Sequence, residues 1–300
     1  TTEIYTLSLH DALPISRQDA PQLAPILNSF GEVLAERARL RADLTGKVPQ
    51  VPAPDRERLL SGVPVLLDAD LSGLAPFLAQ AAERMIPAMA KAFPALAAEL
   101  ESLADGKAMD WGLGLDALLR GDGAALERLA EQAGLAGPVL RFALAQVARP
   151  VLECAQEDVA QAVREAKWLH GRCPSCGSAP DLAIYTAGKQ EDSEFLKNYG
   201  GQRWLRCSLC ATHWRSSRTA CPVCGNEEQA KMGFFFVEGQ ENQRVDHCSV
   251  CGKYLVGLDL RGQDQDPVWA TAGLGMIHLD LLAQQKGFSP AAALPWNRLV

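Results

Sequence analysis

Residues 173–176 read CPSC, residues 207–210 read CSLC, residues 221–224 read CPVC and residues 248–251 read CSVC. These four CxxC pairs hold eight of the nine cysteines in the chain. Glycine follows three of the pairs, at Gly177, Gly225 and Gly252. A CxxC bend directs two thiolates at one ion, and a small glycine lets the chain turn past the second ligand. Two bends complete a tetrahedral four-sulfur site, so the sequence predicts two metal sites.

The spacing of the pairs indicates which of them share an ion. Thirty residues separate Cys176 from Cys207, 23 separate Cys224 from Cys248, and ten separate Cys210 from Cys221. Sequential pairing gives two ribbons that each enclose two β-like runs, as a rubredoxin-like hairpin needs, and we predict it over an interleaved cross-brace. The predicted metal ligands are Cys173, Cys176, Cys207, Cys210, Cys221, Cys224, Cys248 and Cys251.

The expected cofactors are two metal ions, iron or zinc, because tetrahedral sulfur coordination suits either metal. Cysteine sulfur completes both sites, so neither keeps an open position for Lewis-acid catalysis, and each is structural or transfers electrons. His213 and His247 lie near ligands, but the cysteine set is complete without them. Each ribbon spans roughly 45 residues, too few for a self-sufficient core, so we expect residues 168–258 to need metal to fold.

Composition and charge limit the function classes. The 300 residues are 48% hydrophobic and 22% charged, which is typical of a soluble globular protein. No run of about 18 apolar residues predicts a membrane span, and no apolar h-region predicts a secretory signal. Tight CxxC pairs within one third of the chain favour reduced, metal-binding thiolates in the cytoplasm over a secreted disulfide framework.

The charge of the metal region argues against nucleic acid as a partner. The whole chain has a formal net charge of −7, and residues 168–258 carry ten Lys/Arg against nine Asp/Glu, or +1. Two loaded four-cysteine sites would lower this region to about −3. Zinc ribbons that bind nucleic acid usually present a basic face, so we expect no binding to nucleic acid and no membrane insertion.

Residues 17–167 are predicted to form an all-α domain of about five or six helices. Apolar residues recur at helical spacing over residues 22–44, 71–103, 109–119, 124–133 and 137–168. Pro87 and Pro94 should kink or divide the second of these helices. Cys154, the ninth cysteine, lies on an apolar stripe, where we expect a buried, inert thiol. The domain has no phosphate-binding glycine loop, nucleophile elbow or HExxH motif, so we do not expect an enzyme.

From Trp168 onward, helical spacing gives way to short β-like runs. We predict a first rubredoxin-like ribbon over residues 168–212 and a second over residues 213–260. Residues 261–300 should hold a helix near 275–286 and an apolar tail, which docks on its own domain or on a second chain in a homodimer. The predicted strands are Leu182–Tyr185, Arg203–Arg206, Phe234–Val237, Arg244–His247 and Tyr254–Leu258. The expected fold class is therefore α+β multidomain: an all-α domain, two small zinc-ribbon-like four-cysteine domains and a C-terminal helix.

Residues 1–16 are predicted to be a non-native leader. The string YTLSLHDALPI at residues 5–15 reads like a translated sequencing-adapter oligonucleotide. An ordinary exposed N-terminus is the alternative.

The order of the motifs matches one known family. The matching segments are CPSCGSAP at 173–180, RWLRCSLC at 203–210, CPVCG at 221–225, DHC at 246–248 and CGKY at 251–254. Residues 56–62 (RERLLSG) and the ending with Leu281, Ala283, Gln284, Gly287 and Phe288 also fit. Over about residues 17–300 the chain resembles the FdhE family, the formate dehydrogenase accessory proteins.

The resemblance implies a non-catalytic, cytoplasmic factor for the assembly and maturation of respiratory formate dehydrogenase. Such a factor contacts the catalytic subunit, and its rubredoxin-like sites are linked to iron and redox chemistry. We predict that Trp204, Trp214, Arg215 and Arg218 contact this client, with hairpin packing as their alternative role. A small redox protein that acts on a client is the second hypothesis, and a nucleic-acid-binding zinc ribbon is the third.

Overall fold

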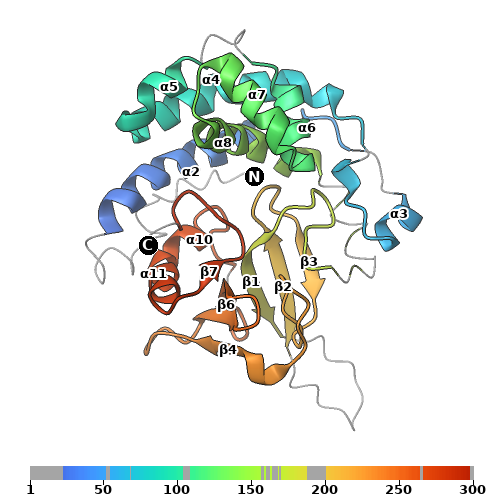
Figure 1. The fold of residues 1–300 in the computed structure, drawn as a ribbon, viewed down its shortest axis with the longest axis vertical. Helices are drawn as coiled ribbons and strands as arrows, with labels where there is room; N and C mark the ends of the chain where they lie inside the picture. The colour runs from blue at the N-terminus through green and yellow to red at the C-terminus, as the bar shows by residue number, and fades with distance from the viewer. Residues whose placement is uncertain are drawn as a thin grey trace, which may run out of the picture.

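A layer of helices lies on one end of a mixed β-sheet, and two short C-terminal helices lie beside the sheet (Figure 1). The computed structural model describes residues 23–51, 55–67, 69–103, 109–156, 159, 163, 168, 170–187, 201–263 and 266–297. The predicted leader, residues 1–16, lies outside these ranges. The expected α+β class, with a helical N-terminal part and four-cysteine clusters in the sheet region, is confirmed.

The helical part follows the predicted apolar periodicity. Its helices are α2 (Ala24–Leu44), α3 (Arg56–Leu60), α4 (Ala75–Ala92), α5 (Ala97–Glu101), α6 (Trp111–Arg120), α7 (Gly123–Ala133) and α8 (Gly137–Ala155). Three 3-10 turns accompany them: η2 (Val65–Leu67), η3 (Ser72–Leu74) and η4 (Pro94–Leu96). Pro87 lies inside α4, whereas Pro94 opens η4 after α4 has ended, so the predicted division occurs at the second proline.

Local sequence signals explain where the helices begin and end. The side chain of Asp110 accepts a hydrogen bond from the Leu113 backbone N–H at 3.0 Å and caps α6. Asp122 caps α7 in the same way through the N–H of Ala125, at 2.9 Å. Gly121 ends α6 with a φ of +65°, a conformation that glycine adopts without steric cost.

The strands of the described residues form one seven-stranded sheet. They are β1 (Pro180–Thr186), β2 (Gln202–Cys207), β3 (His213–Ser216), β4 (Met232–Phe235), β5 (Gln243–Cys248), β6 (Lys253–Asp259) and β7 (Ser289–Pro290). Their order is β3-β2-β1-β6-β5-β4, and β7 pairs with β6. Four of the five predicted strands lie within observed strands, and the predicted Phe234–Val237 overlaps β4 at Phe234 and Phe235 only. The prediction did not include β3 and β7.

Two antiparallel three-stranded units meet in the middle of this sheet. The strands β1, β2 and β3 form one unit, and β4, β5 and β6 form the other. They join through the parallel pair β1–β6, in which Ala183 lies opposite Gly257. β3 begins at His213, directly after the predicted end of the first ribbon, yet it pairs with β2. The limits 168–212 and 213–260 stay predictions, and the strands on both sides of them share one sheet.

The C-terminal segment connects the sheet to the helical layer. It contains α10 (Ala272–Gly275) and α11 (Ile277–Gln285), the second of which is the helix predicted near 275–286. In the tail, Leu294 and Trp296 are buried against Leu27 and Phe30 of α2. The rings of Phe30 and Trp296 lie 5.4 Å apart in an edge-to-face arrangement. The tail, as far as residue 297, therefore docks on its own helical domain.

Among the helices that the structure describes, none is by itself long and apolar enough to cross a membrane. Only α7 and α8 taken together meet the length and composition of a span, and they are bent by 99° at their junction.

Candidate metal centre

The eight predicted ligands come together as two groups of four sulfurs. Within each group the Sγ atoms all lie within 4.8 Å of one another. The groups are Cys173, Cys176, Cys207 and Cys210, and Cys221, Cys224, Cys248 and Cys251. This is the sequential pairing predicted from the spacing, and the interleaved arrangement is not the one observed.

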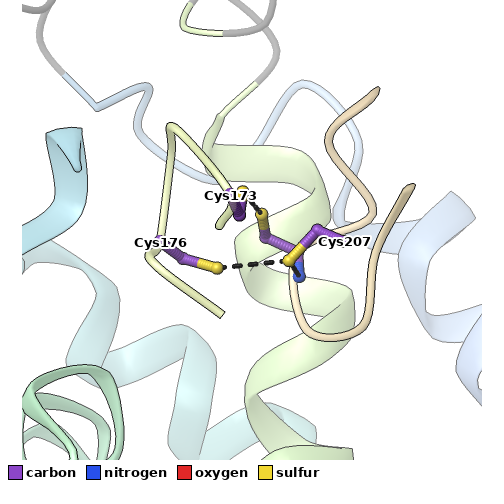
Figure 2. A group of neighbouring side chains, drawn as sticks. Cys173, Cys176 and Cys207 are labelled. Carbon is purple, nitrogen blue, oxygen red and sulfur yellow. Dashed lines mark hydrogen bonds between the residues drawn. The ribbon is translucent and has the colours of Figure 1, made fainter. Parts of the chain in front are cut away.

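The sulfur positions match the size of a tetrahedral metal–thiolate site. The Sγ atoms of Cys173 and Cys210 are 3.6 Å apart, and those of Cys176 and Cys207 are 3.3 Å apart. Figure 2 shows Cys173, Cys176 and Cys207 with their side chains directed toward a common centre. In the second group, both Cys221–Cys251 and Cys224–Cys248 measure 3.8 Å. Metal–sulfur bonds of about 2.3 Å give tetrahedral edges of about 3.8 Å, so each group could hold one ion.

Each CxxC bend is built by backbone hydrogen bonds and a left-handed residue. Gly177, Gly225 and Gly252 have φ values of +77°, +74° and +66°, as the sequence predicts for the residue after the second ligand. The bend at 207–210 lacks glycine, and Ala211 adopts the same conformation with a φ of +56°. In that bend the N–H groups of Leu209 and Cys210 point at the Cys207 sulfur, at 3.3 and 3.4 Å. These donors would stabilise a thiolate.

The sheet places the bends in two equivalent arrangements. In the first unit, one bend precedes β1 and the other connects β2 to β3. In the second, one bend precedes β4 and the other connects β5 to β6. Each cluster is thus formed by a bend before the first strand of a unit and a bend between its second and third strands.

The first cluster is buried against the helical layer. The backbone N–H groups of Val65 and Leu66 in η2 donate to the carbonyls of Pro174 and Ser175, at 3.0 and 2.8 Å. All four cysteines of this cluster belong to the same hydrophobic core as the helices. The cluster therefore helps to attach the sheet to the helical domain.

Two polar residues near the first cluster were not identified from the sequence. The Thr212 hydroxyl lies 3.0 Å from the Cys210 sulfur and donates to Oε1 of Gln156 at 2.8 Å. Gln156 in turn donates through Nε2 to the Cys210 carbonyl at 3.2 Å. Thr212 lies two residues after Cys210, so its position in the sequence could have identified it as a neighbour of the cluster. Gln156 lies 54 residues from Cys210, directly after α8, and nothing in the local sequence marks it.

Burial controls the ionisation of the first cluster. It raises the pKa of Cys173, Cys207 and Cys210 well above that of a free thiol. Burial also opposes ionisation of Cys176, but hydrogen bonds from Cys173, Cys207 and Cys210 bring its pKa well below the ordinary value. Burial therefore opposes ionisation of the sulfurs, and a cation is needed for all four of them to ionise.

The second cluster is more accessible to solvent. Cys224 is exposed and Cys251 is partly exposed, whereas every sulfur ligand of the first cluster is buried. Val223 and Val250, which lie within the two bends, are 43% and 57% exposed. The two sites thus have the same ligands and different surroundings.

The histidines named in the sequence belong to neither sulfur group. The His213 ring packs edge-on against Trp269 at 4.9 Å, and the His247 ring packs on Phe288 at 4.4 Å. Cys154 is 1% exposed, in agreement with the expected buried thiol.

The four predicted client contacts do not form one exposed strip. Trp214 is 1% exposed and donates from Nε1 to the His170 carbonyl at 3.3 Å, which fits the alternative packing role. Trp204 is half-buried. Arg215 and Arg218 are exposed, and Arg218 donates to the Gly201 carbonyl at 2.8 Å. A contact with a client stays a prediction for the two arginines.

Comparison with known proteins relates this arrangement to one family. No family model matches the chain. A protein FdhE homolog of Aquifex aeolicus is 32% identical over 155 residues, which are 52% of this chain and 51% of that protein. Protein FdhE of Escherichia coli is 30% identical over 127 residues, 41% of this chain and 37% of that protein. These alignments span about half or less of the relatives' length.

Longer matches cover nearly the whole chain at lower identity. A protein FdhE homolog of Edwardsiella ictaluri is 25% identical over 293 residues, 92% of this chain and 91% of that protein. The crystal structure of the FdhE protein from Pseudomonas aeruginosa covers 95% of this chain, and 92% of its own chain is covered. It has a TM-score of 0.56 and 21% identity, so it supports the fold. The motifs, the two clusters and these relatives therefore agree that the chain is similar to the FdhE proteins in sequence and in fold.

Proposed function

We propose that this chain is a cytoplasmic accessory protein that binds the catalytic subunit of a respiratory formate dehydrogenase during its assembly. The observation that carries the proposal is a pair of closed four-sulfur clusters in a chain that is similar to FdhE proteins. Each cluster offers four cysteine ligands, so a bound ion has no coordination position left for a substrate. Such sites favour an assembly or redox role over hydrolysis.

The clusters would hold one iron or zinc ion each. Iron would supply one-electron redox chemistry and zinc would supply structural stability. The chain's own contribution is to orient four sulfurs, to donate backbone N–H groups to them, and to bury the first site.

The client surface that we propose surrounds the second cluster. Phe234 and Phe236 are 58% and 46% exposed, and their rings stack with centroids 6.4 Å apart. Phe234 lies on β4, two residues from Met232, which pairs with Cys248. Arg218, one of the predicted client contacts, lines the same cavity as Phe234. Exposed aromatic side chains beside an arginine are typical of protein-binding surfaces.

A pull-down with the catalytic subunit tests this proposal. The chain is purified without oxygen, loaded with metal and mixed with the tagged subunit. We expect the wild type to bind and the double variant Phe234→Ser/Phe236→Ser to lose binding. Leu113→Ser, which changes a 60% exposed side chain on α6, is the matched control and should bind normally. Absence of wild-type binding under both oxidising and reducing conditions would refute the accessory role.

Electron transfer at the second cluster is the second candidate function. The exposure of Cys224 favours it, because electrons enter and leave a rubredoxin-like site through accessible sulfur ligands. Metal analysis and a visible spectrum of anaerobically purified protein decide this point. Ferric-thiolate absorbance that bleaches with reductant supports the redox role. A colourless protein with two zinc ions per chain excludes it.

A further inference from the structure

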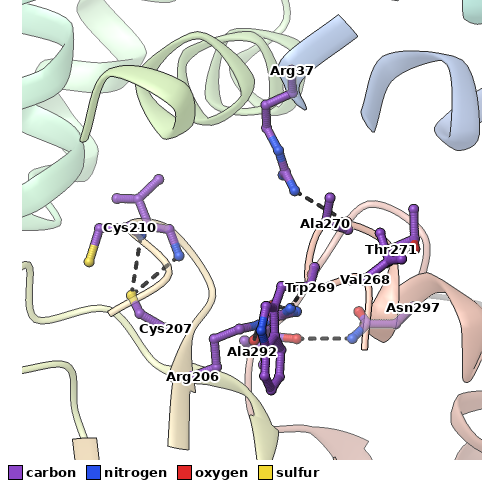
Figure 3. Close-up of polar contacts among 12 residues, drawn as sticks. Arg37, Arg206, Cys207, Cys210, Val268, Trp269, Ala270, Thr271, Ala292 and Asn297 are labelled. Carbon is purple, nitrogen blue, oxygen red and sulfur yellow. Dashed lines mark hydrogen bonds and ion pairs between the residues drawn. The ribbon is translucent and has the colours of Figure 1, made fainter. Parts of the chain in front are cut away.

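A second site of a different kind lies between the helical layer and the sheet. A cavity of about 310 Å³ is bounded by α2, α8, the start of β1, the end of β2 with the bend at 207–210, and the segment around Trp269. Figure 3 shows Arg37 reaching from α2 toward Ala270, with Arg206 and the bend holding Cys207 and Cys210 nearby. The cavity does not include the apolar surface that we assign to the client.

Four arginines and two carboxylates line this cavity. Arg206 forms a two-point ion pair with Asp181, with N–O distances of 2.8 and 2.9 Å. Arg41 pairs with Glu153 at 3.3 Å. Each carboxylate is therefore in contact with one arginine and acts on Arg37 and Arg149 without an ion pair, so four guanidinium groups face two carboxylates.

The remaining guanidinium groups belong to Arg37 and Arg149. Arg37 is 8% exposed and donates a hydrogen bond to the Ala270 carbonyl at 3.3 Å. Arg149 is 5% exposed, and its Nε is buried without a hydrogen-bond partner among the described residues. Its guanidinium lies 5.9 Å from the centroid of the Trp296 ring. A buried donor without a partner costs about 1–3 kcal/mol, and a ligand that accepts a hydrogen bond from Nε of Arg149 would remove this cost.

The charge state of Arg149 agrees with this interpretation. Burial, together with the neighbouring positive charge of Arg37, lowers the pKa of Arg149 to about 10. The guanidinium is therefore still charged at neutral pH, and an anion between the two arginines would relieve both the desolvation and the repulsion.

We propose that this cavity binds a phosphoryl group, either as free phosphate or as part of a small phosphorylated molecule. The four arginines exceed the two carboxylates of the lining by two positive charges, which match a group that carries close to two negative charges at neutral pH, whereas a carboxylate would neutralise only one. The planar fork of a guanidinium donates two parallel hydrogen bonds to phosphate oxygens. The cavity is at the lower end of the usual size for small-molecule sites, and Trp269 and Trp296 provide an aromatic wall for an organic part.

Calorimetric titration of the metal-loaded chain tests the proposal. The probes are inorganic phosphate, ribose 5-phosphate and acetate, each in phosphate-free buffer. We expect one phosphoryl compound per chain to bind, and acetate to bind at least about tenfold more weakly. Equal binding of the two phosphates identifies the free ion as sufficient, and tighter binding of ribose 5-phosphate identifies a phosphorylated molecule. Either result supports the site, whereas equal binding of acetate and phosphate overturns it.

Two variants separate a ligand site from a purely structural one. Arg149→Met keeps the length of the side chain against Trp296, and Arg37→Gln keeps a donor. Both should weaken phosphate binding about ten- to hundredfold. Arg39→Gln, on the same helix and 68% exposed at its side chain, is the control and should bind as the wild type does.

The stability and metal content of Arg149→Met provide the second readout. Without phosphate, this variant should melt at a higher temperature than the wild type, because it no longer buries an unpaired charge. With phosphate, only the wild type should gain stability. The rival role for these arginines is to balance the negative charge of the first cluster. A wild type that binds no phosphate, together with an Arg149→Met variant that loses metal, would establish that role and overturn ours.

Discussion

At Gly252 the backbone has a φ of +66°, and no atom lies within 4 Å of the position of an added Cβ. The only penalty for a side chain there is the backbone conformation itself. We predict that Gly252→Ala lowers stability by about 1 kcal/mol, which is the order of the left-handed penalty for an L-residue. Thermal unfolding of the metal-loaded protein measures the change. An unchanged melting temperature would contradict the prediction.

Ala211 provides the reverse experiment. It already has a φ of +56° in the bend at 207–210, so Ala211→Gly should leave stability unchanged or raise it by up to about 1 kcal/mol. The pair of variants separates the cost of backbone conformation from any effect on the metal, which we expect to stay bound in both.

Asp280 makes the stability depend on pH. It is 2% exposed and accepts a hydrogen bond from the Tyr254 hydroxyl at 2.7 Å. Burial raises the pKa of Asp280 from 3.8 to about 7. Because the pKa of Asp280 is higher in the folded state than in the unfolded state, its contribution to folding stability is greatest below about pH 4. This contribution is lost as the pH rises through about 7. Between pH 5.5 and pH 8, the free energy of unfolding of the wild type should fall by about 2 kcal/mol because Asp280 ionises. We predict that Asp280→Asn does not show this decrease.

Chemical denaturation of wild type and Asp280→Asn across this pH range checks the prediction. The side-chain amide keeps an acceptor for Tyr254 and cannot ionise, so only the pH dependence should change. Protonation of the cysteine ligands affects both proteins alike and cancels in the difference. Parallel curves for the two proteins would mean that Asp280 does not ionise across this range.

At the residue scale, the metal ligands could be predicted from local sequence, but the helical residues that lie near them could not. A CxxC bend is encoded within four residues, and the glycine after it adds a fifth. Gln156 and Arg149 come from the helical part, where they read as ordinary polar positions of a long helix. Their roles depend on which face of α8 meets the bend at 207–210, and that contact exists only in the tertiary structure.

At the scale of elements, the ribbons were predictable as hairpins but not as a sheet. β1, β2, β4, β5 and β6 each contain β-branched or aromatic residues and lie between turn signals. β3 is a four-residue strand, His213–Ser216, that follows the bend at 207–210 without a turn signal of its own at its far end. The parallel β1–β6 pair joins strands about 70 residues apart, and strand pairing over such a distance has no local signal.

The two clusters differ in burial, and this predicts an order of metal loss. We expect a chelator to remove one ion per chain quickly, from the cluster with Cys224, and the other ion slowly. A difference in opening free energy of about 1.4 kcal/mol already gives a tenfold difference in rate. Release is followed with a coloured metal indicator under reducing conditions. Cys224→Ser should remove the fast phase alone, and a single phase in the wild type would contradict the prediction.

At the scale of the molecule, the first cluster lies where the sheet packs on the helices, and the second cluster lies away from them. Cys173, Cys176, Cys207 and Cys210 share a hydrophobic core with α2, α4 and α8. Of the second cluster's ligands, Cys221 and Cys248 are buried, but the described core groups contain none of the four. Loss of the ion from the first cluster should therefore destabilise the helices, and loss of the ion from the second cluster should act locally.

Matched variants test this division. We predict that Cys176→Ser removes one ion and lowers the melting temperature of the helical signal by on the order of 10 °C, because a core shared by sheet and helices loses its central support. Cys224→Ser also removes one ion, yet the helical signal should melt within about 2 °C of the wild type, since that cluster does not contact the helical core. Far-ultraviolet circular dichroism follows the helices, and metal analysis confirms that each variant has lost one ion. If both variants lower the melting of the helices equally, the two clusters support the fold to the same extent. In that case the sheet transmits the loss of the second site through the β1–β6 pair, which is its only described strand connection to the first unit.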